Sequence, residues 1–301
     1  MNSNNETSDN ERDSDSEELA MDEVSSDTIA TLKTSLKQDP NQYELHTQLI
    51  VLLKNTDMLD ELRQAREAMS AAFPLTEELW IEWIADESNM AITGDEKKHV
   101  LSLYERATSD YLSITIWKSY VSYAIQEYTE YMEHPSNDNV VDMAYLRYLF
   151  RKADKSTGHH VSQSHIIWDM QKDFELQQLS SKEPANPEDV DRVKAMFLER
   201  ITTPHSTLEE TFSSLSSFIS QYDGDDYEST MVQNSNIVSA TRDLLSKLEP
   251  FEESLVQDLT FMFTHAHNTV LAKQCPNSRI GFNLLDFNKQ QLGHIQKLSG
   301  V

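Results

Sequence analysis

The sequence predicts an all-α fold, a right-handed α-solenoid built from antiparallel helix pairs. Three observations predict it. Gly and Pro are scarce, at 6 and 8 of 301 residues, and so few chain breakers leave few turns for the many short strands of a β-sandwich. From residue 28 onward, apolar residues recur at the three- and four-residue spacings of one helix face. Tryptophan recurs at equivalent positions of successive predicted helices.

The charge and cysteine content exclude several classes of protein. The chain has 25 Lys and Arg against 51 Asp and Glu, a formal net charge of -26, which argues against autonomous nucleic-acid binding because phosphate recognition requires cations. The single Cys275 rules out an intrachain disulfide and suits a reducing compartment. The sequence has no signal-peptide pattern and no apolar run that would span a bilayer. We therefore expect a nuclear or cytosolic protein.

Residues 1–27 differ in composition from the rest of the chain. They hold ten acidic residues and one basic residue, Arg12, among many Ser and Asn. So little apolar mass cannot offset the entropy of ordering, and we expect a disordered acidic tail. Ser14 and Ser16 precede acidic residues and are either kinase acceptors or simply solvating residues.

The helices follow in order after this tail. Apolar spacing predicts helices over residues 29–36, 44–54 and 61–73. Pro74 ends the third, and Thr76 is placed to cap the next, which contains ELWIEWIADE at 78–87. Breaks at TGDE (93–96) and SDYLS (109–113) then bound predicted helices at 97–108 and 114–128. These short connections predict antiparallel neighbours.

The repeat becomes visible when the Trp-bearing segments LWIEWIADE, IWKSYVSYA and IWDMQKDFE are aligned. Each has a Trp at its second position, and the residues three, six and seven positions further on can be aligned. These are Trp83, Asp86 and Glu87 in the first segment, Tyr120, Tyr123 and Ala124 in the second, and Gln171, Phe174 and Glu175 in the third. The partner helices VLSLYERA, YLRYLFRKA and VKAMFLERI each carry an aromatic residue followed closely by Arg or Lys, and TFSSLSSF is a fainter copy of the Trp-bearing segment. Polar insertions at EHPSNDN and SSKEPANPED lengthen two turns. The predicted repeat-motif residues are Trp80, Trp83, Glu87, Tyr104, Arg106, Trp117, Tyr120, Tyr123, Phe150, Trp168, Phe174, Glu175, Phe197 and Arg200.

This pattern resembles the half-a-tetratricopeptide (HAT) repeat, and LRQAREAMSAAFPLTEELWIEWIADESNMA is similar to the first repeats of the spliceosome recycling factors of that family. The resemblance implies a helical-repeat arm that holds partner proteins in RNA processing. In that family RNA is bound mainly by RNA-recognition motifs beyond the repeats, and their signature is absent here. Two departures are the loss of the motif Glu at Ala124 and of the motif aromatic at Gln171.

The chain is thus expected to comprise the acidic tail (1–27), a HAT-repeat array (28–250) and a divergent C-terminal segment (251–301). The final segment, from VQDLTFMF onward, matches neither the repeat nor the family pattern. We expect a truncated form, a splice variant or a gene-model product. Because the later repeats of the family mediate dimerisation, self-association of this chain stays open.

Each candidate site has a structural alternative. Trp80, Trp83 and Glu87 share one helix face, which predicts packing between helices rather than an exposed hot spot for a partner. His265, His267 and Cys275 have metal-ligand side chains but lack a fourth ligand, so we expect no zinc site. His159 and His160 are expected to be solvated. The basic side chains are interpreted as surface charge, with Arg106 and Arg200 as possible ion-pair partners; the others are Lys97, Lys98, Arg147, Arg151, Lys152 and Lys155.

The sequence therefore predicts a non-catalytic protein-interaction scaffold without cofactors. HExxH, GxSxG and P-loop signatures are absent. The resemblance implies work in pre-mRNA splicing and in snRNP assembly or recycling, in the nucleoplasm and also in the cytoplasm. Spliceosomal snRNP components or other basic partners are expected, because an acidic surface attracts them. The alternatives are a generic helical-repeat adaptor outside RNA metabolism and a helical enzyme supported only by the supply of His and carboxylates.

Overall fold

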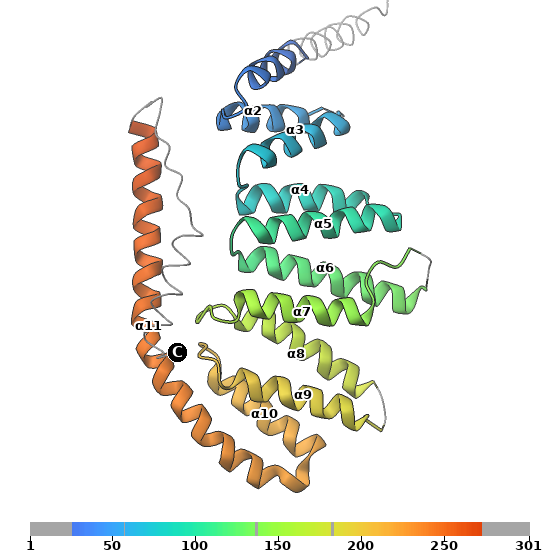
Figure 1. The fold of residues 1–301 in the computed structure, drawn as a ribbon, viewed down its shortest axis with the longest axis vertical. Coiled ribbons are helices and arrows are strands. Elements are labelled where there is room, and N and C mark those ends of the chain that lie inside the picture. Colours follow the sequence, from blue (N-terminus) through green and yellow to red (C-terminus); the bar gives the residue numbers. More distant parts are fainter. Residues whose placement is uncertain (1–25, 57, 136–137, 182–183, 273–301) are drawn as a thin grey trace, which may run out of the picture. The chain divides into compact units, whose positions relative to one another are not determined.

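The predicted all-α fold is confirmed. The computed structural model describes residues 26–56, 58–135, 138–181 and 184–272, with side chains as far as residue 254 except 226 and 253, and no strand occurs among these residues. A first helix covers residues 26–38. The remaining elements are α2 (Tyr43–Lys54), α3 (Leu59–Ala72), α4 (Glu77–Met90), α5 (Gly94–Asp110), α6 (Ile114–Glu133), α7 (Met143–Thr157), α8 (His165–Ser180), α9 (Pro187–Arg200), α10 (Leu208–Tyr222), the 3-10 turn η1 (Gly224–Asp226) and α11 (Tyr227–Ala272) (Figure 1).

The chain divides into two compact units, Met1–Glu87 and Ser88–Val301. In the first, α2 and α3 form an antiparallel pair whose facing sides are apolar. α2 buries Leu49, Ile50 and Leu53, and α3 buries Leu62 and Met69. These spacings place each set on one side of its helix. The pair is therefore held by the same apolar periodicity that predicts the helices.

In the second unit, several helices begin at a residue whose side chain accepts a hydrogen bond from a backbone N–H of the first turn. Thr93 and Glu96 form a capping box at α5, in which each side chain accepts a hydrogen bond from the other residue's backbone N–H. The side chains of Ser113 and Asp142 accept backbone N–H groups at the starts of α6 and α7. Asn186 caps α9, and Pro187 occupies its first position. The predicted polar turn SSKEPANPED is therefore shorter than expected, because its last residues form the first turn of α9.

The core of the second unit runs between successive helices rather than around one centre. One cluster joins α8, α9, α10 and the start of α11, and its members are Trp168, Leu179, Val193, Phe197, Ile201, Leu208, Leu215, Phe218, Ile219 and Val238. Each helix contributes to a continuous apolar layer, as expected for stacked hairpins that cannot bury their faces alone. The layer includes residues from the segments IWDMQKDFE, VKAMFLERI and TFSSLSSF.

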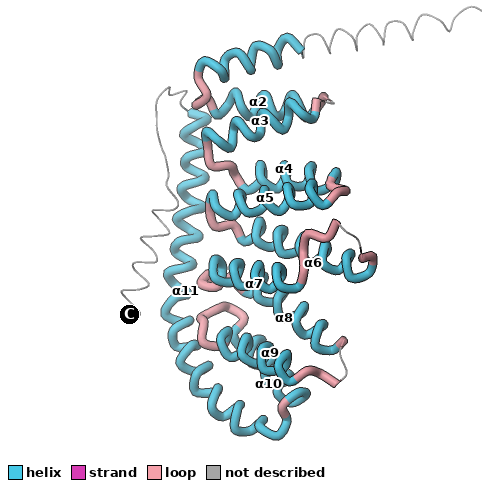
Figure 2. The backbone as a smooth tube through the Cα atoms, turned by 45° about the vertical axis from the view of Figure 1, so that its right-hand side comes forward, coloured by secondary structure: helices cyan, strands magenta, loops and turns pink. Residues whose placement is uncertain are grey.

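The helix α11 is longer than the others, and Figures 1 and 2 show it as one continuous, curved helix. Its first part buries Asn234, Val238, Thr241 and Leu245, which lie on one face. Pro250 lies inside the helix, where it lacks a donor and crowds the preceding turn. The predicted boundary at residue 250 therefore falls inside a helix rather than in a connection. The predicted acidic tail falls almost wholly outside the described residues, as do residues 273–301 of the C-terminal segment.

A single carboxylate ties α11 to the loop between α7 and α8. One oxygen of Glu252 accepts hydrogen bonds from the backbone N–H and the hydroxyl of Ser162, at 2.9 and 2.8 Å. The ring Nδ1 of His160 lies 3.0 Å from the same oxygen. Glu252 follows Pro250 by two residues, so this contact anchors α11 to the α7–α8 loop just after the proline.

We predict that Glu252→Ala frees this loop. Loss of the charged acceptor removes the only described partner of the Ser162 amide, so hydrogen exchange at that amide should accelerate roughly tenfold in the variant. Exchange mass spectrometry or NMR of the α7–α8 loop measures this directly. Glu249→Ala, an exposed position one turn away on α11, is the matched control. Equal exchange in the wild type and Glu252→Ala would show that other contacts hold the loop.

Candidate functional site

The motif aromatics are packed against one another. In α4, the rings of Trp80 and Trp83 stack with centroids 5.3 Å apart and planes 2° from parallel. Each side chain is only 1% exposed. In the second unit, Tyr120 of α6 stacks on Tyr104 of α5 at 4.9 Å and on Trp117 of its own helix at 6.0 Å. These rings therefore join a Trp-bearing helix to the helix that precedes it.

The contacts continue through the later helices. Phe174 of α8 meets Phe150 of α7, with ring centroids 5.7 Å apart. Trp168 of α8 meets Phe197 of α9 at 5.4 Å, and Phe197 in turn meets Phe218 of α10 at 5.5 Å. Such offset and edge-to-face contacts are favourable beyond the apolar area that they bury. The aromatic positions of one segment thus connect to those of the next.

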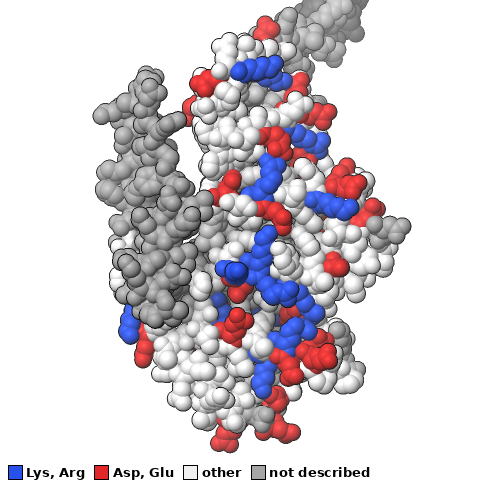
Figure 3. Space-filling view, viewed as in Figure 1, with Lys and Arg blue, Asp and Glu red and all other residues white. Residues whose placement is uncertain are grey.

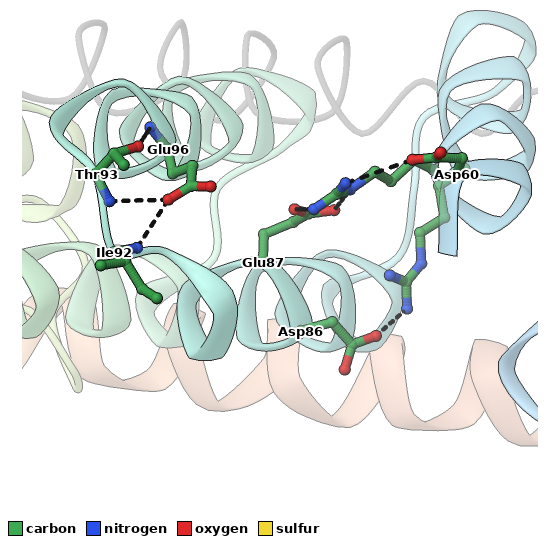
Figure 4. A network of polar contacts seen from close by, with 8 residues as sticks. Asp60, Asp86, Glu87, Ile92, Thr93 and Glu96 are labelled. Atoms are coloured by element: carbon green, nitrogen blue, oxygen red, sulfur yellow. Dashed lines mark hydrogen bonds and ion pairs between the residues drawn. The ribbon is translucent and has the colours of Figure 1, made fainter. Parts of the chain in front are cut away.

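The motif glutamate in α4 is buried and charged. Glu87 is 4% exposed, and Arg63 of α3 donates to both of its oxygens, from Nε at 2.8 Å and from Nη2 at 2.7 Å. Arg63 also lies 3.7 Å from Asp60 of its own helix. Next to this pair, Arg66 donates to Asp86 at 2.5 Å (Figure 4). The two helices are therefore joined by two neighbouring ion pairs, of which one is bidentate.

The same arrangement recurs in α8. Glu175 is 4% exposed and accepts hydrogen bonds from Arg147 of α7, at 2.8 and 3.1 Å. Arg192 of α9 donates to it from the other side at 3.0 Å. The buried carboxylate therefore links three consecutive helices. Burial of such a charge is tolerated because both oxygens are occupied by cationic donors.

The repeat that lacks the motif glutamate uses a different residue. Ala124 is buried in α6, and Glu127, one turn further along the same helix, is also buried and lies 2.8 Å from Nζ of Lys97 in α5. In α10, where the motif is faintest, Asp223 at the end of the helix pairs with Lys194 of α9. In each case a cation on the second helix of one hairpin reaches an acid on the first helix of the next. The ion pair is retained while its position shifts.

The structure places most predicted motif residues in the core. Arg106 is half-buried, and the remaining thirteen are buried: Trp80, Trp83, Glu87, Tyr104, Trp117, Tyr120, Tyr123, Phe150, Trp168, Phe174, Glu175, Phe197 and Arg200. Sequence reasoning did not identify Arg63, Glu127 or Arg192. A charged residue within an apolar helix face is the signal that could have found Glu127, but nothing in the sequence indicated its partner.

Arg200 adopts a different environment from the one expected. The sequence suggests an ion pair, whereas Nη2 of Arg200 donates to the hydroxyl of Ser164 at 2.9 Å and the guanidinium lies 5.6 Å from the Trp168 ring centroid. Burial lowers the pKa of Arg200 to about 10, which leaves it charged at neutral pH. Nearby, burial and the Arg200 charge lower the pKa of His205 to about 4, so this histidine is neutral. Both residues are therefore part of the packed interior.

Exposed acidic side chains gather at the turns within the hairpins of the second unit. We call this group the acidic edge; its members are Asp95, Glu96, Glu130, Glu133, Asp138, Asp142, Glu188, Asp225 and Glu228. They lie at the α4–α5, α6–α7, α8–α9 and α10–α11 connections, and Figure 3 shows acidic side chains along that side of the molecule. Acids at the starts of helices also stabilise the helix dipole. The acidic edge therefore stabilises some helix starts and also produces a negative electrostatic potential at these turns.

Neither a metal site nor a membrane segment emerges from the described part of the chain. No group of His, Cys, Asp or Glu there has the arrangement of a metal site, and none of its helices combines the length and apolarity of a membrane span. The side chains of His265 and His267, and Cys275 altogether, lie outside the described residues. His160, expected to be solvated, instead contacts Glu252, and His159 is exposed.

Comparison with known proteins gives consistent relatives. A model of the Suppressor of forked protein (Suf) family matches residues 27–283. The chain is 30% identical over 229 residues to "Spliceosome associated factor 3, U4/U6 recycling protein" of Pongo abelii and 29% identical to that of Homo sapiens, covering 76% of this chain and 22% of each relative. It is 22% identical to "mRNA 3'-end-processing protein rna14" of Schizosaccharomyces pombe, covering 78% of this chain and 31% of that protein. The chain thus spans about a fifth of the length of the first two relatives.

We predict that Trp80→Ala lowers the free energy of unfolding by roughly 3–5 kcal/mol, through lost burial and the cavity left beside Trp83. Urea titration followed by circular dichroism measures the change. Val51→Ala, an exposed position 55% accessible in the same unit, is the control and should change stability by less than about 0.5 kcal/mol. Unchanged unfolding of Trp80→Ala together with lost partner capture would instead identify a binding hot spot.

We also predict that Glu175→Gln is more destabilising than Glu105→Gln. The first substitution leaves two arginines without their buried carboxylate, and because both are partly exposed we expect a loss of roughly 1–3 kcal/mol. The second removes the largely exposed pair between Glu105 and Lys152 and alters a contact of Glu105 with the Tyr120 hydroxyl, for which together at most about 1 kcal/mol is expected. Urea titration compares them, and equal losses would mean that the buried position confers no additional stability.

Proposed function

This chain belongs to the Suppressor of forked protein (Suf) family, and from that membership we propose that it is a non-catalytic protein-interaction scaffold in RNA processing. More specifically, we propose that it serves pre-mRNA splicing, in the assembly or recycling of spliceosomal snRNPs in the nucleus. The names of its relatives in Pongo abelii, Homo sapiens and Mus musculus support this, since each is described as a U4/U6 recycling protein. The chain spans about a fifth of their length, and the role that we propose for it is partner docking.

The burial and pairing of the repeated motif side chains support a scaffold rather than an enzyme. A general acid or base has to reach a substrate, yet Glu87 and Glu175 are buried and engaged by arginines. Tyr120 is buried, and its hydroxyl shares a hydrogen bond with Tyr145 at 2.7 Å. Burial raises the pKa of Tyr104 to about 12, which keeps its hydroxyl protonated. These groups hold helices together, and the exposed surface is left for partners.

The acidic edge is the feature that carries the proposal about partners. It presents negative side chains at successive hairpin turns of the second unit, so a basic segment can contact several turns at once. Contacts spread over repeats give affinity without a deep pocket. We therefore propose Arg- and Lys-rich segments of snRNP proteins as partners, with protein rather than RNA as the bound macromolecule.

Capture from nuclear extract tests this proposal. The tagged full chain should enrich U4/U6 snRNP proteins, as measured by quantitative mass spectrometry. Glu133→Lys combined with Glu188→Lys, both on the acidic edge, should lower that enrichment at least several-fold, because like charges then face a basic partner. Asp243→Lys combined with Glu249→Lys makes the same change of charge at exposed positions of α11 and should leave enrichment unchanged.

Other outcomes would select the alternatives. Enrichment of 3'-end-processing factors instead would favour the role named in the Schizosaccharomyces pombe relative. Recovery of a complex unrelated to RNA metabolism would indicate a generic helical-repeat adaptor. Turnover of a substrate by the purified chain would indicate an enzyme. An equal loss of snRNP proteins in both double variants would show that the acidic edge is not the surface that binds them.

A further inference from the structure

The helix α7 carries an excess of positive charge on a strongly acidic chain. Its sequence, MAYLRYLFRKADKST, contains four basic residues and one acidic residue, while the whole chain has a net charge of -26. Figure 3 shows Lys and Arg side chains gathered over the region of α7 to α9. Most of the neighbouring cations are engaged, however, so the excess alone does not make a binding surface.

Two of the four cations on α7 are engaged within the protein. Arg147 donates to the buried Glu175 at 2.8 Å, and Lys152 pairs with Glu105 of α5 at 2.9 Å. Arg151 and Lys155 are different: both are exposed, and neither forms an ion pair or hydrogen bond with any described residue. They lie four residues apart, one helical turn, so their charged groups point the same way.

The single acid on α7 does not neutralise this pair. Asp154 is half-buried, and burial raises the pKa of its carboxyl group, with the charge of Arg200 acting in the opposite direction. On the same face of α7 as Arg151, Tyr148 lies three residues earlier and is 50% exposed. Tyr148, Arg151 and Lys155 therefore form one outward strip with an aromatic ring beside two free cations, which we call the α7 face.

We propose that the α7 face binds a short acidic segment of a partner protein, with carboxylates about one helical turn apart next to an apolar side chain. The Arg151 guanidinium suits a carboxylate in bidentate geometry, and Lys155 supplies a second charge. The exposed ring of Tyr148 covers the apolar neighbour. This interaction goes beyond the proposed function, because its partner has the opposite charge to the basic segments that the acidic edge attracts.

The surroundings of the α7 face favour a short peptide over RNA. The helix has 15 residues, which at 1.5 Å per residue gives a strip of only about 22 Å. A polyanion that continued past it would come near Glu199, an exposed acid of α9 whose charge acts on Asp154 of α7. At physiological ionic strength, charges further away than about 8 Å are largely screened. A short segment therefore feels the local cations, whereas a longer phosphate backbone also meets the acidic neighbours.

Fluorescence anisotropy with a defined probe tests the proposal. The probe is a short fluorescein-labelled peptide of Glu and Leu residues, and the protein is the full chain. We expect saturable binding that weakens as salt is added, and a loss of affinity of about tenfold in Arg151→Glu combined with Lys155→Glu. Lys118→Glu is the matched control: Lys118 is exposed on α6 and has no ion-pair partner among the described residues. It should bind the probe as the wild type does.

A second variant examines the aromatic part of the surface. Tyr148→Ala should reduce the preference for the Glu and Leu peptide over a Glu and Gly peptide of equal charge, while Arg151→Lys retains most of the salt-dependent binding. Circular dichroism melting shows whether each variant is folded. Absence of saturable binding by the wild type would overturn the proposal, as would an equal loss in Lys118→Glu. Tighter binding of fluorescein-labelled poly-uridine RNA than of the peptide would also overturn it.

Discussion

A buried carboxylate that reaches a cation on the preceding helix is the constraint on which the rest of this structure depends. Apolar faces alone would allow neighbouring helices to slide, because dispersion and hydrophobic burial are not directional. A buried charge does not allow this, since its burial is tolerated only while its donors remain in place. Arg63 and Glu87 impose this condition in the first unit, and Arg147 and Glu175 impose it in the second. The ion pairs therefore set the register that the aromatic rings then fill.

The second repeat shows that the constraint, rather than the particular residue, is retained. Ala124 removes the motif carboxylate, yet Glu127 restores a buried acid one turn later and Lys97 reaches it from α5. The shift is possible because positions three apart on a helix lie on nearly the same face. In the same helix, Tyr120 and Tyr123 are both in ring contact with Tyr104 of α5. A degenerate sequence repeat can therefore correspond to a regular arrangement of contacts.

Much of the fold follows from the sequence because helix periodicity is a local property. Thr76, expected as a cap, accepts the backbone N–H of Leu79 at 3.4 Å, and α3 ends before Pro74. The Trp register predicted which face each ring occupies. Partners across helices could not be predicted, because spacing identifies a face and not its neighbour: nothing in the chain links Lys97 to a residue thirty positions away. Apolar spacing likewise does not show that α11 continues through Pro250, since a proline that kinks a helix and one that ends it look the same in sequence.

The same ion pairs between helices determine where most of the positive charge in the described residues lies. Most Lys and Arg residues in the described part of the chain pair with carboxylates, and those at Arg63, Arg147 and Arg192 join neighbouring helices. The net charge of the chain therefore says little about the electrostatic potential at any one face. Salt screens distant charges, so the potential there depends mainly on the residues nearby. Part of the acidic edge lies at helix starts, where the dipole favours acids, and Lys155 lies in the last turn of α7, where the dipole favours a cation. Arg151 lies in the middle of α7, where the dipole has no such preference. The helix dipole thus does not explain the exposed Arg151, and recognition of an acidic segment is the role that Arg151 and Lys155 together fit.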